Sequence, residues 1–195
     1  MSGLLGSRKN NNVKNQLIWM ILLAIGLFLI GIAVIVVLPK SKGKNTLPTE
    51  YSAKPIEVDI PAPQITLTDL SAKFVSLKDY SNKIILVNNW ATWCPPCKAE
   101  MPTLQRYYQA HGEQGLVIVA IESGESIDEV SNFVQEYSLT FPVWIDIKGL
   151  ALEEFKNWDL PSSYVIDRTG TIRLTWTGPI SMDMLEEYVT PLLDQ

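Results

Sequence analysis

Residues 84–97 read IILVNNWATWCPPC, and this stretch decides the fold. Its first part, IILV, is a continuous apolar run, which is typical of a strand buried on both faces in the centre of a sheet. From Cys97 through Leu104 to Tyr108 the apolar residues recur at helical spacing, so a helix follows the strand after a short turn. The sequence therefore predicts that its two cysteines, Cys94 and Cys97, lie where this helix begins.

Strand-like and helix-like patterns alternate on both sides of this stretch. Strands are expected at ITLTDL, KFVSL, LVIVAIE, FPVWID, SYVID and TIRLTW, from apolar runs or two-residue alternation. Helices are expected after the capping pair Ser126 and Glu129, from Leu150 to about Trp158, and from Ser181 onward. We expect the first helix to stop at Gly112 in a left-handed conformation.

The order of these elements predicts the fold class. ITLTDL and KFVSL form a short antiparallel hairpin around Ser71 and Ala72 at the start of the domain, and the last two strands form another around 168–170. The strands and helices between them need crossover connections, which make strands parallel. We therefore expect an α/β protein with a central mixed sheet, parallel in its middle and flanked by helices.

An uncharged apolar segment, LIWMILLAIGLFLIGIAVIVVL, precedes the domain at residues 17–38. It is longer than the roughly 20 apolar residues that a helix needs to cross a bilayer, so it predicts a transmembrane helix. A cleaved signal peptide is the alternative, but its apolar region has about 7–15 residues and ends at a small-residue cleavage site, which we do not find. The chain then divides into a tail at 1–16, the transmembrane helix, a polar linker at 39–57 and a folded domain at 58–195.

Basic residues flank the apolar segment on both sides, so their distribution does not decide its orientation. They are Arg8, Lys9 and Lys14 before it and Lys40, Lys42 and Lys44 after it. Without these six, ten Lys and Arg remain against all 21 Asp and Glu, which leaves the rest of the chain a net charge near −11. Such a surface argues against nucleic acid or anionic lipid as a partner, because phosphates bind basic patches.

Cys94 and Cys97 are three residues apart, so on a helix they face the same side and can form a disulfide. The N-terminus of a helix stabilises a thiolate, the attacking species, through its unpaired N–H groups and its dipole. Because Pro96 disfavours a helical conformation before it, we place Pro95 at the cap and Pro96 at the first helical position. The two prolines lack N–H groups, which leaves Cys97 N–H as the nearest backbone donor to the Cys94 sulfur.

Three alternatives to redox catalysis remain open for this pair. A structural disulfide would close so short a loop that it would contribute only about 2 kcal/mol. Zinc usually needs four ligands, and His111 is the sole histidine of the chain. A pair of inert buried thiols is the third, although the flanking Trp93, Pro95 and Pro96 favour an exposed loop with an accessible Cys94 sulfur.

The segment NNWATWCPPCKAEMP resembles the signature of extracytoplasmic thioredoxin-like proteins of the TlpA, ResA and CcmG type. PAPQITLTDLSAKFVSLKDYSNKIILV, FPVWID, LPSSYVIDRTGTI and the final helix resemble the same family in the same order, so the likeness covers about residues 60–195. It implies a thioredoxin-like fold and a thiol–disulfide oxidoreductase. In that family the first cysteine attacks a substrate disulfide and the second resolves the mixed disulfide, which would be Cys94 and Cys97 here.

The resemblance also implies roles for residues around the cysteines. Pro161 matches the family's cis-proline, which would set the backbone of Leu160 against the cysteines to pair with a substrate chain. Glu100 matches an acidic residue that would relay the proton of the resolving thiol. Trp93, together with Trp90, would wall the site beside Pro95 and Pro96, so the expected substrate contacts are Trp93, Pro95, Pro96, Leu160 and Pro161.

The sequence departs from the family pattern at a few positions. Asn88 stands where cytoplasmic thioredoxins carry a buried aspartate, which agrees with the extracytoplasmic group. Asn89 replaces the usual phenylalanine, and Ser162 and Ser163 replace the commoner threonines. The loss of the aspartate makes Glu100 more important as a proton acceptor. Pro102 is expected to kink the first helix, and His111 to compensate the helix dipole rather than to catalyse.

The expected function is that of a membrane-anchored reductase. A membrane dithiol would supply electrons, and the reduced pair would reduce a disulfide in an exported protein, apocytochrome c being the substrate that the resemblance favours. We expect no cofactor besides the redox-active disulfide, no metal and no nucleic acid. Because disulfide substrates occur in oxidising compartments, the domain is expected outside the cytoplasm and the tail inside.

Two other functions use the same residues. An oxidase or isomerase would run the exchange in the opposite direction, since direction depends on reduction potential and on the compartment. A Cu(I) chaperone would bind the metal through both thiolates. The domain offers few other soft ligands for copper, namely Met101, Met182, Met184 and His111.

Overall fold

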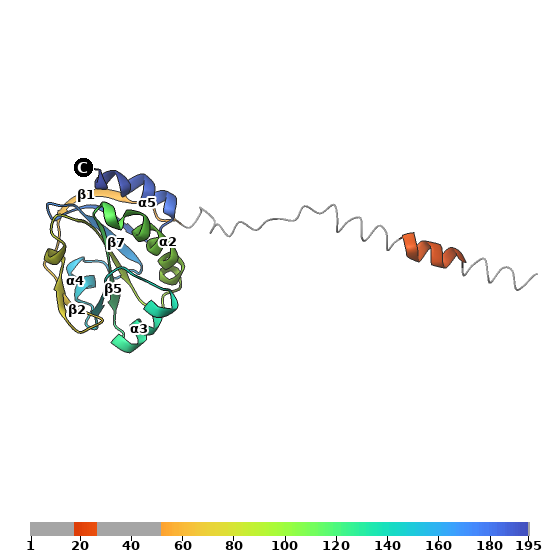
Figure 1. Ribbon diagram of the computed structural model, residues 1–195, viewed down its shortest axis with the longest axis horizontal. Helices are drawn as coiled ribbons and strands as arrows, with labels where there is room; N and C mark the ends of the chain where they lie inside the picture. The colour runs from red at the N-terminus through yellow and green to blue at the C-terminus, as the bar shows by residue number, and fades with distance from the viewer. Residues whose placement is uncertain (1–17, 27–51, 195) are drawn as a thin grey trace, which may run out of the picture. The chain divides into compact units, whose positions relative to one another are not determined.

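The structure is a computed structural model that describes residues 18–26 and 52–194 (Figure 1). Residues 18–26 form a helix whose large apolar side chains are exposed. Within the described residues, no helix has both the length and the apolar character needed to cross a membrane. The tail at 1–16, residues 17 and 27–38 of the predicted transmembrane segment, and the linker up to residue 51 lie outside the described residues.

One sheet organises the folded domain. In the described part of the chain it has eight strands, in the order β1-β8-β7-β4-β5-β6-β2-β3. The strands are β1 (Ile56–Pro61), β2 (Thr66–Asp69), β3 (Phe74–Ser76), β4 (Ile84–Trp90), β5 (Leu116–Ser123), β6 (Val143–Asp146), β7 (Ser162–Ile166) and β8 (Thr171–Thr177). β4, β5 and β6 pair in parallel and the remaining pairs are antiparallel, which confirms the mixed sheet with a parallel centre.

Helices cover both faces of this sheet. They are α2 (Pro95–His111), α3 (Ile127–Glu136), α4 (Leu150–Glu154), α5 (Met182–Tyr188) and α6 (Thr190–Leu193), with single 3₁₀ turns η2 (Leu77–Tyr80) and η3 (Gly112–Gln114). Along β4, Leu86 packs with buried residues of α2, α3, α5 and α6, whereas Val87 packs on the opposite face with residues of α4 and η2. The strand is buried at every position because side chains meet a covered face in both directions.

Several predicted elements have the expected bounds. β2 and β3 form the N-terminal hairpin, with Ala72 in its turn at a positive φ of 60°. Ser126 caps α3 through the predicted capping box, in which Ser126 N–H donates to Glu129 at 3.0 Å and the Ser126 hydroxyl accepts from Glu129 N–H at 3.4 Å. β7 and β8 form the closing hairpin.

Other boundaries differ from the prediction. β1 precedes the hairpin and pairs with β8, although residues up to 57 were expected to be linker. Most β1 side chains are exposed at the sheet edge, so the strand carries little of the apolar pattern on which the prediction depends. α4 ends at Glu154 instead of near Trp158, and Lys156 reverses the chain with a φ of 55°.

The end of α2 also differs. Gly112 has a right-handed conformation, with φ −57° and ψ −39°, so the predicted left-handed stop is wrong. The chain continues through η3, and Gly115 ends that turn in the left-handed region at φ 99°. A glycine is favoured there because other residues rarely adopt this conformation.

Candidate active site

A disulfide joins Cys94 and Cys97 at the start of α2, with their Cα atoms 5.3 Å apart. Cys94 is itself the helix cap, since its sulfur accepts a hydrogen bond from Cys97 N–H at 3.3 Å. The nearest backbone donor is therefore the predicted one. Pro95 was expected at the cap but is the first helical residue, because proline has no side-chain acceptor with which to cap a helix.

The sulfur of Cys94 is less accessible than predicted. Cys94 is only 3% exposed and Cys97 is fully buried, and both belong to the core cluster that packs under α2. The neighbouring Trp93 is 66% exposed and Pro95 is also exposed. The loop is thus on the surface as expected, whereas the disulfide lies just beneath it.

The two tryptophans near the site have different environments. Trp90, the last residue of β4, is fully buried and packs against Phe133 of α3 with 4.7 Å between ring centroids. Its indole supports the strand end from within the core, so it does not wall the site as the sequence suggested. Trp93 is the one of the pair that is available to contact another molecule.

The peptide bond between Leu160 and Pro161 is cis, as expected from the resemblance. Pro161 directly precedes β7, and Ser162 of β7 pairs with Asn89 near the end of β4, which brings this loop to the same end of the sheet as the cysteines. Leu160 packs against the core cluster that contains both cysteines. Its N–H and C=O have no hydrogen-bond partner in the described part of the domain, so they are available to another chain.

Glu100 lies one turn after Cys97 on α2 and is buried, at 1% exposure. Its carboxyl accepts hydrogen bonds from the Asn88 side chain at 2.9 Å and from Ile180 N–H at 3.2 Å. Burial raises the pKa of Glu100 to about 8, because these two hydrogen bonds only partly offset the loss of water. The carboxyl of Glu100 can therefore hold its proton near neutral pH.

Asn88 and Asn89 of β4 form hydrogen bonds with the two serines that follow Pro161. The Asn88 amide donates to Ser163 Oγ at 3.0 Å as well as to Glu100, and the Asn89 amide donates to Ser162 Oγ at 3.4 Å. All four residues are buried. These pairs join β4 to β7, so the substitutions fit one another across the sheet.

A second buried carboxyl lies at this end of the sheet and was missed by the sequence analysis. Glu122 ends the apolar part of β5, opposite Trp90 of β4. Burial, followed by the nearby Glu125 and Asp146 carboxylates, raises the pKa of Glu122 to about 8. The signal in the sequence is a single carboxyl at the end of a run of six apolar residues, LVIVAI.

His111 lies in the last turn of α2, where its predicted role was dipole compensation. Its Nε2 contacts Glu186 of α5 at 2.9 Å, and its ring packs on Tyr107. Burial lowers the pKa of His111, but hydrogen bonds to Glu186 and Gln114 outweigh it, so the net pKa is raised. The residue lies at the far end of α2 from the cysteines and joins two helices.

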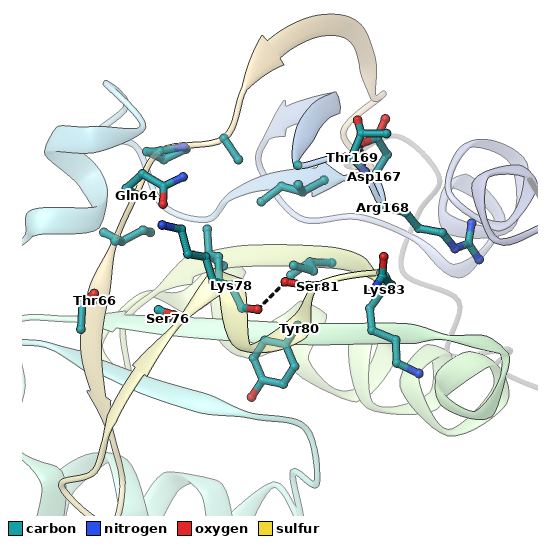
Figure 2. A pocket seen from close by; sticks show the side chains of 18 residues that line it. Gln64, Thr66, Ser76, Lys78, Tyr80, Ser81, Lys83, Asp167, Arg168 and Thr169 are labelled. Atoms are coloured by element: carbon teal, nitrogen blue, oxygen red, sulfur yellow. Dashed lines mark hydrogen bonds between the residues drawn. The ribbon is translucent and has the colours of Figure 1, made fainter.

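A cavity of the described domain lies away from the cysteines. It has a volume of about 390 Å³ and is lined by the β2–β3 hairpin, η2, the start of β4 and the β7–β8 turn, with Lys78 and Ser81 among the side chains that Figure 2 shows. Ile85 lines it, whereas the cysteines follow the other end of β4. Within the described chain, no three His, Cys, Asp or Glu side chains gather in a way that could hold a metal ion.

A CxxC disulfide at the start of the helix that follows a central strand, with a cis-proline before the adjacent strand, defines a thioredoxin-like protein. The model of the AhpC/TSA family matches residues 58–175. The chain belongs to this family.

Two relatives of this chain are named thiol-disulfide oxidoreductases. The thiol-disulfide oxidoreductase ResA of Bacillus thuringiensis subsp. konkukian is 37% identical over 134 residues, which cover 69% of this chain and 78% of the relative. ResA of Oceanobacillus iheyensis is 34% identical over 169 residues, covering 87% of this chain and 86% of the relative.

Solved structures are also similar to this chain. StoA of Bacillus subtilis has a TM-score of 0.57 at 27% identity, covering 67% of this chain and 98% of that one. A putative thiol:disulfide interchange protein DsbE of Chlorobium tepidum has a TM-score of 0.65 at 24% identity, covering 71% and 99%, and shows the same fold.

The raised pKa of Glu100 predicts how stability depends on pH. Because the folded state holds this proton up to about pH 8 while the unfolded state releases it near pH 4.5, unfolding becomes easier as pH rises between these values. Glu100→Gln should flatten the decline by up to about 1.4 kcal/mol per pH unit. Urea unfolding of the oxidised protein from pH 5 to 8 measures the slope. Glu113→Gln, at an exposed position, is the control, and equal slopes in wild type and Glu100→Gln would contradict the prediction.

Proposed function

We propose that this protein is a thiol–disulfide oxidoreductase that works as a reductase of disulfides in exported proteins. The observation that carries the proposal is the Cys94–Cys97 disulfide at the start of α2, beside the unpaired main chain of Leu160. The family, and relatives named thiol-disulfide oxidoreductase, support the reaction class.

The exchange takes place in two displacements. The Cys94 thiolate attacks one sulfur of a substrate disulfide, the substrate S–S bond breaks, and one substrate thiolate leaves and takes a proton. Cys97 then loses its proton and attacks the Cys94 sulfur, which releases the second substrate thiolate and leaves the Cys94–Cys97 disulfide. Two electrons pass to the substrate, and a membrane dithiol donor returns two electrons to the pair.

Glu100 is proposed to accept the proton of Cys97. It lies one helical turn after Cys97 and is buried like that residue. The pKa of Glu100, about 8, is close to the value near 8.5 of an ordinary thiol, so the two groups are matched for proton transfer. A group matched in this way can take a proton and release it near neutral pH.

The start of α2 supports the reducing direction. Pro95 and Pro96 occupy the first two helical positions and have no N–H, so Cys97 N–H makes the one backbone hydrogen bond to the Cys94 sulfur among the described residues. A thiolate with few donors is poorly stabilised. A dithiol whose thiolate form is poorly stabilised gives up its electrons more readily.

The substrate is proposed to lie along the cis-proline loop. The free N–H and C=O of Leu160 would pair with an extended substrate segment, as an edge strand pairs. Trp93, Pro95, Pro96 and Pro161 would contact the side chains of that segment. Apocytochrome c, an exported chain with two neighbouring cysteines, is the substrate that we propose.

We further propose that residues 17–38 anchor the chain in the cell membrane, with the tail at 1–16 in the cytoplasm and the domain outside. The length and apolar character of this segment support the anchor. The ResA relative of Oceanobacillus iheyensis matches 169 residues of this chain, more than the folded domain contains.

The reduction potential tests the direction. Equilibration of the full-length protein with glutathione should give a value below about −200 mV, because the thiolate of Cys94 is weakly stabilised. The fraction oxidised can be read from alkylated thiols at each ratio of glutathione to its disulfide. A value well above about −200 mV would instead indicate the oxidase or isomerase.

Trapping tests the attacking cysteine. Cys97→Ser should accumulate mixed disulfides with exported proteins, since the intermediate can no longer be resolved, and non-reducing electrophoresis with mass spectrometry should identify them. Cys94→Ser is the matched control and should trap far less. Equal trapping by both variants, or none by Cys97→Ser in folded protein, would contradict the assignment.

Protease accessibility tests the orientation. A protease is added to cells whose cell membrane is intact and whose outer layers let the protease pass. It should digest the domain, because the proposal places the domain outside the cell membrane. A cytoplasmic protein serves as the control for lysis. Complete protection of the domain under conditions that digest a known external protein would contradict this localisation.

A further inference from the structure

Thr92, two residues before Cys94, is held by a carboxylate from another part of the chain. Thr92 N–H donates to Glu125 Oε2 at 2.7 Å, and the Thr92 hydroxyl donates to Glu125 Oε1. Thr92 lies in the turn that a hydrogen bond from Cys94 N–H to the Ala91 carbonyl closes at 3.2 Å. Glu125 therefore holds the middle of the turn that presents Cys94.

Glu125 is in turn attached to the sheet. It lies between β5 and α3, and its N–H donates to Glu122 Oε2 at 3.2 Å. Glu122 is fully buried and stands opposite Trp90, the last residue of the strand that leads to the cysteines. The turn that contains Thr92 and the loop that contains Glu125 thus follow two paired residues, Trp90 of β4 and Glu122 of β5. This pairing limits the movement of the turn relative to the loop.

The charge of Glu125 has no cation next to it. In the described chain the ion pairs join His111 to Glu186 and Arg173 to Asp59 and Asp167, and none includes Glu125. Glu122 is largely protonated at neutral pH because its pKa is about 8, so it does not repel Glu125. The Glu125 carboxylate therefore binds Thr92 without a cationic partner among the described residues, and a carboxylate disfavours ionisation of a thiol close to it.

We propose that Glu125 is a positioning residue that acts on Cys94 through Thr92. By holding both donors of Thr92, it fixes the turn two residues before Cys94 and places a carboxylate beside that turn. That charge destabilises the thiolate and so makes the reduced pair a stronger reductant. The inference rests on the proposed attack by Cys94, and it adds a residue that touches no reacting atom.

A purely structural role predicts something different. Glu125 precedes α3, and a carboxylate near a helix N-terminus stabilises the helix wherever its side chain points. Loss of such a role lowers the melting temperature alone. Loss of the proposed role changes the pKa of Cys94 and the equilibrium with glutathione.

The test compares four variants of the full-length protein with wild type. Glu125→Gln removes the charge, Thr92→Val removes only the hydroxyl donor, and Thr92→Ser keeps it. Glu136→Gln removes an exposed carboxylate of α3 that has no contact with Thr92. The readouts are the pKa of Cys94, from the pH dependence of its alkylation, and the equilibrium with glutathione.

Glu125→Gln should raise the thiolate fraction of Cys94 at pH 7 about threefold, because a nearby negative charge is lost. At a pH above the pKa of Cys94, where the reduced pair is mainly thiolate, the equilibrium with glutathione should move about threefold toward the reduced pair, about 14 mV for two electrons. Thr92→Val should shift both readouts in the same direction by less, since it removes one of the two hydrogen bonds that hold the carboxylate and leaves the bond from Thr92 N–H. Thr92→Ser and Glu136→Gln should match wild type.

The double variant Glu125→Gln with Thr92→Val should equal Glu125→Gln alone, because the charge acts through the hydrogen bonds to Thr92. Additive effects would overturn the inference, as would an equal effect of Glu136→Gln or unchanged readouts in a less stable Glu125→Gln protein. If Glu125→Gln does not fold, Thr92→Val and Thr92→Ser test the inference. Thr92→Val should shift both readouts and Thr92→Ser should not, and equal readouts in the two variants would overturn the inference. Wild type separates the two proposals: an unreactive Cys94 there contradicts the proposed function, whereas normal reactivity with unaffected variants contradicts only this inference.

Discussion

The site depends on the short turn between β4 and α2. β4 is buried at every position and is held between the parallel strand β5 and the antiparallel strand β7, so its end has a fixed place. α2 begins five residues after β4 ends and packs a buried face on the same sheet. Because both elements are anchored, the sulfur of Cys94 is held at the first turn of the helix, where Cys97 lies within bonding distance.

Two buried carboxyls lie at this end of the sheet, on different elements. Glu100 approaches from α2 and is bound by Asn88 and Ile180, while Glu122 approaches from β5 and binds the loop that carries Glu125. Burial raises the pKa of both to about 8, which lets each stay neutral at a low free-energy cost near pH 7. The surroundings of Cys94 therefore contain two carboxyls that can hold a proton near neutral pH and, among the described residues, a single backbone donor to its sulfur, as the proposed reductase requires.

The likeness to ResA, StoA and DsbE proteins extends over the sheet and its helices, so it accounts for the fold and the reaction class. The direction of electron flow depends on finer features. The prolines at the first two positions of α2 remove backbone donors, and Glu125 binds the turn at Thr92, two residues before Cys94. Such features act over a few ångströms and differ between proteins that share one fold.

The sequence alone determined the elements whose signal is local: the buried strand β4, the capping box of Ser126, the hairpins, and the cysteine pair at a helix start. It missed β1, whose exposed edge position leaves almost no apolar pattern, and it could not separate the buried Trp90 from the exposed Trp93. Only the tertiary structure joined Thr92 to Glu125, 33 residues away, and burial of the surrounding chain set the protonation of Glu100 and Glu122. Periodicity and capping are properties of neighbouring residues, whereas desolvation and cross-strand contacts arise when distant segments pack together.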